Sequence, residues 1–89
     1  MHQAHLFISG FVQGVGFRYF VRSQAISLGL CGWVRNVPDS RVEVVIQGSK
    51  KKIEALIAHC QLGPVVSNVE QVDVVWESVT TQLTKFVVK

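Results

Sequence analysis

The stretch GFVQGVGFRYFV, residues 10–21, decides the fold because two different patterns of apolar residues meet in it. Residues 4–12 form a short apolar run rich in β-forming residues, which predicts a strand. From residue 17 to residue 28 the apolar side chains recur at helical spacing, which predicts a helix. The GVG segment at 14–16 interrupts both patterns, so the chain passes here from a strand through a tight loop into a helix.

A strand hairpin is expected after this helix. Residues 30–36 alternate and lead into Pro38-Asp39-Ser40, which is a turn signal. Residues 41–47 then alternate with a period of two, which places their apolar side chains on one face of a strand. We therefore expect 30–36 and 41–47 to pair as neighbouring antiparallel strands.

A second helix and two further strands complete the pattern. Ser49 is placed to cap a helix that Gly63-Pro64 closes. Residues 69–77 alternate again and predict a strand, and KFVV at 85–88 predicts a short edge strand. The apolar face of the second helix consists of Ile53, Leu56, Ile57 and Cys60. The aromatic residues expected in the core are Trp33, Trp76 and Phe86.

The order β-α-β-β-α-β predicts an α+β, ferredoxin-like fold in a single domain over residues 1–89, with two helices on one face of an antiparallel sheet. The first two strands are joined by a helical crossover and run parallel, with the third strand between them. Their C-terminal ends therefore share one edge, where Arg18 follows one strand and Asn36 ends the other. At this strand separation the two residues lie about 10 Å apart and are able to share one small ligand.

Composition and charge narrow the class of protein. The chain has 89 residues and a net charge of +3, which fits a small anionic partner as well as a nucleic acid. No apolar run approaches the roughly 18–20 residues that a membrane span needs, and no signal peptide is evident. Cys31 and Cys60 form no CxxC pair and are expected to be reduced, so we expect a cytoplasmic protein. The scattered histidines predict no metal site, and no cofactor is expected.

The GVGFR segment has the chemistry of an anion site. Small residues let backbone N–H groups turn inward, and the first turn of the helix adds free donors and a positive dipole. Arg18 adds a planar fork of donors suited to two phosphate oxygens. Three simpler interpretations remain open: Gly14 and Gly16 serve only a tight turn, Arg18 is a solvated side chain, and Asn36 is a turn residue before Pro38.

Neither Arg18 nor Asn36 has an acid, a base or a nucleophile near it in the sequence. A site built only from hydrogen-bond donors binds and polarises a phosphoryl group but does not protonate a poor leaving group. It suits a leaving group that departs unaided, such as a carboxylate, whose pKa is about 4. The residues therefore favour an acyl phosphate over an ordinary phosphate ester.

Two motifs closely resemble the acylphosphatase family, whose signatures have the forms G-x-V-Q-G-V-x-[FM]-R and G-[FYW]-[AVC]-[KRQAM]-N. They read GFVQGVGFR at 10–18 and GWVRN at 32–36. The spacing between the motifs also matches, and the likeness extends over nearly the whole chain. One departure is Ser40, where the family usually has a glycine after Asp39, at a turn position that often requires a positive φ.

The resemblance implies hydrolysis of small acyl phosphates by a monomeric enzyme, without a metal or a covalent intermediate. Asn36 would orient the attacking water, while Arg18 would hold the phosphoryl group and stabilise the transition state. Inorganic phosphate or sulfate would occupy the same site, and neither a nucleic acid nor a membrane is expected as a partner. The implied phosphate-binding residues are Gln13, Gly14, Val15, Gly16, Phe17 and Arg18.

Two other functions compete with this one. A ferredoxin-like domain that binds RNA would carry aromatic residues on its third strand, and RVEVVIQG at 41–48 has none. Acylphosphatase-like domains also begin the hydrogenase maturation carbamoyltransferases, which handle carbamoyl phosphate. The zinc-finger cysteines of those proteins are missing here, so we expect a free-standing domain.

Overall fold

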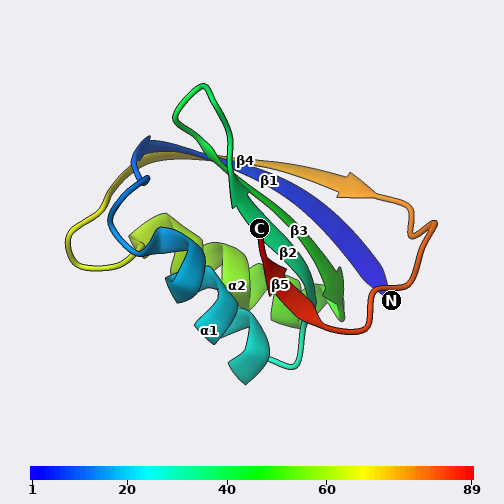
Figure 1. Cartoon of the computed structure of the whole chain (residues 1–89). Helices are drawn as coiled ribbons and strands as arrows, with labels where there is room; N and C mark the ends of the chain where they lie inside the picture. Colours follow the sequence, from blue (N-terminus) through cyan, green and yellow to red (C-terminus); the bar gives the residue numbers. More distant parts are fainter.

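The computed structural model describes residues 1–89 and contains two helices and one five-stranded sheet (Figure 1). The predicted ferredoxin-like α+β fold is confirmed, and the predicted elements agree with the observed ones to within two residues at their ends. In chain order the elements are β1 (His2–Phe11), α1 (Phe17–Ser27), β2 (Cys31–Asn36), β3 (Val42–Gly48), α2 (Lys50–Leu62), β4 (Asn68–Glu77) and β5 (Phe86–Val88). Neither helix has the length and hydropathy that would let it cross a membrane.

The sheet has the strand order β4-β1-β3-β2-β5, so β3 lies between the parallel strands β1 and β2 as predicted. The first four strands pair antiparallel, but β5 pairs parallel to β2, so the sheet is mixed and not purely antiparallel. The reason is that residues 78–85 carry the chain from β4 at one edge to the opposite edge, and β5 therefore enters beside β2 in the same direction (Figure 1).

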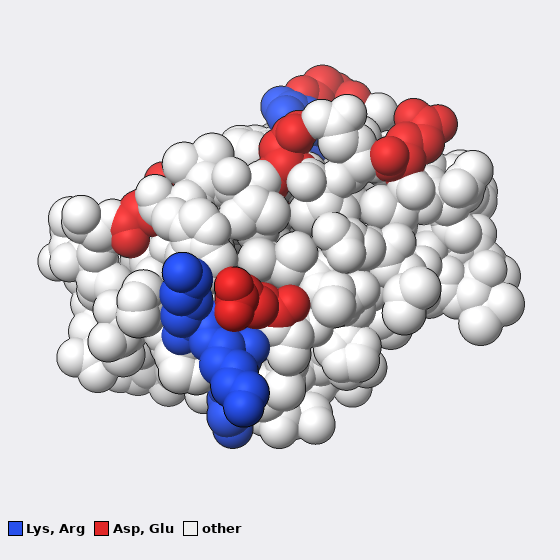
Figure 2. All heavy atoms as spheres, turned by 180° about the vertical axis from the view of Figure 1, so that it is seen from behind, with Lys and Arg blue, Asp and Glu red and all other residues white.

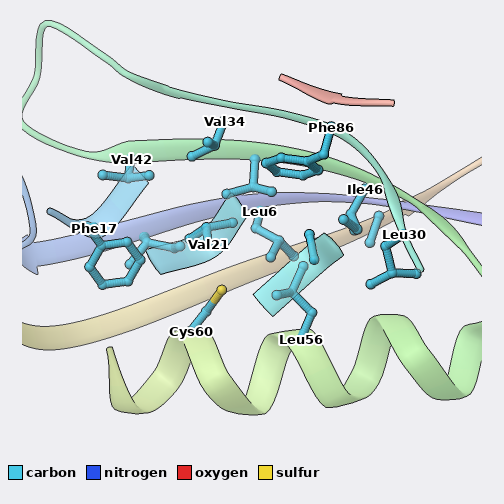
Figure 3. Packing of buried hydrophobic residues seen from close by; sticks show 14 of the residues in the cluster. Leu6, Phe17, Val21, Leu30, Val34, Val42, Ile46, Leu56, Cys60 and Phe86 are labelled. Carbon is cyan, nitrogen blue, oxygen red and sulfur yellow. The ribbon is translucent and has the colours of Figure 1, made fainter. Parts of the chain in front are cut away.

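The core lies between the sheet and the two helices (Figure 3). Leu6 of β1 and Val34 of β2 point from the sheet toward the helices, and Leu56 points from α2 toward the sheet. None of the three has any exposed surface. Phe17 begins α1 and is 1% exposed. Burying apolar side chains of this size stabilises the fold by about 1.5–3 kcal/mol each, and this burial fixes α1 against the sheet.

Two aromatic residues predicted in the core lie outside it, whereas Phe86 is buried as predicted. Trp33 precedes the buried Val34, and the alternation of β2 places the indole on the sheet face that carries no helix. Trp76 shares its face with apolar residues of β4 but lies beyond the core and is 42% exposed. The sequence pattern reports the face of a strand, but not how far along the strand the helices cover it.

The hairpin turn between β2 and β3 keeps the shape of a glycine turn although it contains a serine. Ser40 has a φ of 77°, and the turn is closed by hydrogen bonds between Val37 and Arg41 and from Ser40 to Val37. Such a φ is uncommon for a residue with a Cβ atom. The serine therefore adopts the positive φ that a glycine at this position would allow.

The helix-free face of the sheet has a charged cluster at its centre. The Glu43 carboxylate is almost fully buried and accepts hydrogen bonds from Nε of Arg35 and from Nε2 of His5, each at 2.5 Å. Burial alone would raise the pKa of Glu43, but these two partners outweigh it and hold the pKa below its ordinary value. The cluster therefore ties β1, β2 and β3 together from the side opposite the core.

Figure 2 shows the molecule from behind, where the charges are confined to separate places. Most of the visible lysine and arginine side chains gather low on this face beside an acidic group, and a smaller basic group lies among the acidic groups of the upper rim. Most of this face is uncharged. It offers no extended basic surface of the kind that follows a nucleic-acid backbone.

Glu43→Gln should lower the free energy of unfolding by about 1–3 kcal/mol at neutral pH, because Arg35 and His5 then face a neutral amide in place of the buried carboxylate that they bind. The pKa of Glu43 is lowered in the folded state, so its stabilising effect is complete above the ordinary value of 4.5 and is lost as the pH falls through the folded value. The difference between wild type and variant should therefore shrink on acidification. Urea unfolding between about pH 7 and pH 3 measures it; a difference that stays constant contradicts the prediction, and Glu54→Gln is the exposed control.

Candidate functional site

A small pocket of about 130 Å³ lies where β1 passes into α1 and where β2 ends. The structure therefore places Arg18 and Asn36 on one pocket, as the predicted topology requires. The remaining lining consists of loop backbone and apolar or aromatic side chains. The lining residues are Val12, Gly14, Gly16, Phe17, Arg18, Tyr19 and Asn36.

Two glycines give the loop its shape. Gly14 and Gly16 have φ angles of 75° and 78°, in the left-handed region that glycine adopts without strain. No atom of another segment lies within 4 Å of the Cβ position of either glycine, so the space above the loop is open. The glycines therefore provide both the turn and close access to the backbone.

Gly16 also caps the N-terminus of α1. No side chain accepts a hydrogen bond from this helix end, and the first turn contains no acidic residue. The free N–H groups of the first turn and the helix dipole thus act on the same space as the loop. This arrangement attracts an anion to the mouth of the helix.

Arg18 is half-buried and is held by the other end of the chain. Its Nη1 donates a hydrogen bond of 2.7 Å to the main-chain oxygen of Lys89, which follows β5. No Asp or Glu side chain forms an ion pair with Arg18, since the ion pairs of the protein involve other residues. One side of the guanidinium is fixed, and its remaining donors are left for a ligand in the pocket.

Asn36 is the last residue of β2 and is half-buried at the pocket. An asparagine amide provides both donors and an acceptor, so it is able to bind a water molecule and a phosphoryl oxygen together. The position follows from strand pairing alone: Asn36 lies opposite Val42, the first residue of β3. Its location depends little on the side chains of the loop.

The two other loop residues named from the sequence do not line the pocket with their side chains. The Gln13 amide donates hydrogen bonds of 2.8 and 2.9 Å to the carbonyl oxygens of Val37 and Arg41. Val15 packs against the core. The side chain of Gln13 thus fixes the β2–β3 hairpin relative to the loop, and only the backbone of 13–15 is left to contact an anion.

Two residues at the site, Lys89 and Tyr19, were not predicted from the sequence. Lys89 contacts Arg18 only because β5 pairs with β2, and the two residues are 71 positions apart in the chain. Tyr19 is exposed at the pocket and directly follows Arg18. A helical pattern marks such a residue as solvent-facing, but this does not distinguish a pocket rim from open surface.

The cysteines lie outside this pocket. Burial raises the pKa of the Cys60 thiol to about 12, so it remains protonated at neutral pH and is a poor nucleophile. Cys31 is half-buried at the start of β2. The pocket itself therefore offers N–H donors, one cation, one amide and the hydroxyl of Tyr19, which bind and polarise an anion.

Comparison with known proteins gives a consistent result. The sequence model of the acylphosphatase family matches residues 4–88. A curated acylphosphatase of Roseiflexus sp. (strain RS-1) is 48% identical over 80 residues, which cover 90% of this chain and 86% of that protein. The crystal structure of acylphosphatase from Bacillus subtilis has a TM-score of 0.97 at 32% identity, covering 100% of this chain and 99% of that chain. Full-length HypF in its phosphate- and nucleotide-bound form has a TM-score of 0.89 at 33% identity, covering 100% of this chain but 12% of that chain.

Gln13→Ala should lower the free energy of unfolding by about 1–3 kcal/mol, because two hydrogen bonds to the hairpin are lost and their acceptors are partly buried. Urea unfolding of both proteins measures this difference. Gln61→Ala, at an exposed position of α2, is the matched control and should change stability by less than about 0.5 kcal/mol. Equal effects of the two substitutions would show that the Gln13 amide does not hold the hairpin.

Proposed function

Since the chain belongs to the acylphosphatase family, we propose that it hydrolyses small acyl phosphates to a carboxylate and inorganic phosphate in the pocket of Arg18 and Asn36. One observation carries the proposal. A fixed arginine, an amide and the uncapped start of α1 act on one space of about 130 Å³. That space suits a phosphoryl group and leaves the acyl group outside.

The phosphoryl group binds to the backbone of 13–18. The free N–H groups at the start of α1 donate to its oxygens, and the two glycines allow them to approach closely. Inorganic phosphate or sulfate binds in the same way. Arg18 lies in the first turn of α1, where the positive end of the helix dipole disfavours a cation, and the bound anion offsets this by placing negative charge between the two.

Arg18 holds the phosphoryl group and stabilises the charge that builds up on its oxygens in the transition state. Because Nη1 is occupied by Lys89, the guanidinium is oriented before the substrate binds. Preorganised donors of this kind need no rearrangement during the reaction. Most of the catalysis of phosphoryl transfer comes from such positioning and electrostatic stabilisation.

Asn36 orients the water that attacks phosphorus directly. The water oxygen forms the new P–O bond while the bond from phosphorus to the carboxyl oxygen breaks, and the bonding electrons leave with the carboxylate. The protons of the water pass to phosphate and solvent. The leaving carboxylate, with a pKa of about 4, needs no proton, so the reaction requires neither a general acid nor a covalent enzyme intermediate.

We further propose that the protein works as a monomer in the cytoplasm and without a metal ion. The lining of the pocket includes no carboxylate, thiol or imidazole side chain of the kind that holds a metal. The proposed partners are small acyl phosphates and inorganic phosphate, with no nucleic acid and no membrane. The third strand supports this, because its helix-free side carries Glu43, Val45 and Gln47 and no aromatic residue for stacking a base.

Arg18→Ala should lower kcat/KM for benzoyl phosphate by about 10³-fold or more, because both substrate binding and transition-state stabilisation lose a charged donor. Arg18→Lys should restore little of this activity, since an ammonium cannot bind Lys89 and two phosphoryl oxygens in the same geometry. The assay follows the loss of benzoyl phosphate in the presence of a chelator. Arg22→Ala, an exposed position on the same helix, is the control and should retain normal activity.

Asn36→Ala should lower kcat by about 10²–10³-fold with a smaller change in KM, because the water is no longer oriented while the phosphate loop is intact. The two parameters are measured with the same assay. Inorganic phosphate should still bind the variant. Normal kcat in this variant would remove Asn36 from the mechanism, and a chelator that abolishes wild-type activity would contradict metal independence.

A further inference from the structure

The larger hollow of the protein is separate from the proposed catalytic pocket. It has a volume of about 370 Å³, against about 130 Å³ for the pocket of Arg18 and Asn36, and the two share no lining residue. A volume of this size is typical of small-molecule sites. Its lining residues are Gly32, Trp33, Gln82, Leu83, Thr84, Lys85, Val87 and Lys89.

This hollow opens on the helix-free face, along the edge formed by β2 and β5. Trp33 pairs with Val87 in the parallel register, and their neighbours Val34 and Phe86 are buried in the core. Trp33 and Val87 therefore point to the opposite face, where the indole lies beside the aliphatic side chain. Together with Leu83 they give the hollow an apolar wall.

The segment that forms its other wall is held in place by a buried side chain. Gln47 is 2% exposed; its Nε2 donates to the carbonyl oxygen of Thr81, and its Oε1 accepts from the N–H of Leu83, at 2.7 and 2.8 Å. The N–H of Gly32 donates to the carbonyl oxygen of Lys85 at the end of the same segment. The hollow is thus built from fixed backbone on both sides and is not a gap under a loose loop.

The charged side chains that line this hollow are both lysines. Nζ of Lys89 lies 4.2 Å from the centre of the Trp33 ring, and Lys85 lines the same space. No acidic side chain belongs to the lining, and neither lysine takes part in an ion pair with an Asp or Glu side chain. The site therefore combines an aromatic and aliphatic wall with two cations that lack a carboxylate partner.

We propose that this hollow is a second binding site, which takes a small molecule with an aromatic ring and one anionic group. The ring packs against Trp33, Leu83 and Val87, where its burial provides the main attraction. The anionic group binds the ammonium groups of Lys85 and Lys89. An aryl carboxylate and a nucleotide both have this chemistry, and the experiment separates them.

The test follows the two tryptophan indole N–H signals by NMR of the nitrogen-labelled protein, since the chain has two tryptophans. Naphthoate is compared with neutral naphthamide, and adenosine monophosphate with adenosine. The Trp33 signal and the Val87 amide should shift in a saturable way with at least one anionic ligand, while Trp76 stays in place. The dissociation constant should be on the order of 1–10 mM, as for small ligands of this size, and at least about threefold higher for the neutral partner.

Substitutions provide the second part of the test. Lys85→Gln and Lys89→Gln should each weaken binding of the anionic ligand by about two- to fivefold. Trp33→Leu should weaken binding more than Trp33→Phe, because phenylalanine keeps an aromatic ring for the ligand to pack against. Lys52→Gln and Trp76→Phe are controls outside the hollow and should leave the affinity for the anionic ligand unchanged. A separate titration with inorganic phosphate should shift the amides of 14–18 and not Trp33, so failure at one site is distinguishable from failure at the other.

Three outcomes would overturn the proposal. The first is the lack of a saturable shift at Trp33 and Val87 with either anionic ligand. The second is equal affinity for the neutral and the anionic partner. The third is a response confined to the amides of 14–18, which would mean that the aryl anion binds only in the catalytic pocket.

Discussion

The hydrogen bond from Arg18 to the main-chain oxygen of Lys89 is the contact on which the geometry of the site depends. It exists only because β5 pairs parallel with β2, and that pairing requires residues 78–85 to cross from one edge of the sheet to the other. Gln47, buried in β3, fixes this crossing by binding the backbone on either side of Gln82. A polar side chain in the central strand thus helps to determine the direction of an arginine at the mouth of the pocket.

The sequence predicted those parts of the structure that depend on local pattern and topology. Hydrophobic periodicity predicted the helices and strands, and the glycines predicted the loop between β1 and α1. The predicted strand order placed Arg18 and Asn36 at one edge of the sheet, where they line one pocket. What it missed depends on contacts between distant residues. The partner of Arg18 lies 71 positions away, and the Gln13 amide binds the hairpin 24 and 28 positions further on. No periodic pattern contains such information.

Trp33 and Trp76 show a second limit of pattern reasoning. Both are large and apolar, and both lie on strands whose alternation was correctly recognised. One points to the face without helices, and the other lies on the helical side but past the end of the packed region. Hydrophobicity favours burial in general. It does not state which face of a two-sided sheet the helices cover, or that an indole on the other face forms the wall of a hollow.

The lining of the proposed catalytic pocket also limits which phosphates it would cleave. Backbone N–H groups, a guanidinium and an amide stabilise negative charge on the phosphoryl oxygens, but they supply no proton to a leaving group. A carboxylate leaves without one because its pKa is about 4, whereas an alkoxide needs a proton, and the only side-chain hydroxyl in the lining is that of the exposed Tyr19. Selectivity for acyl phosphates over phosphate esters therefore needs no pocket for the acyl group. It follows from the chemistry of the leaving group, which explains how a space of about 130 Å³ is sufficient for the reaction.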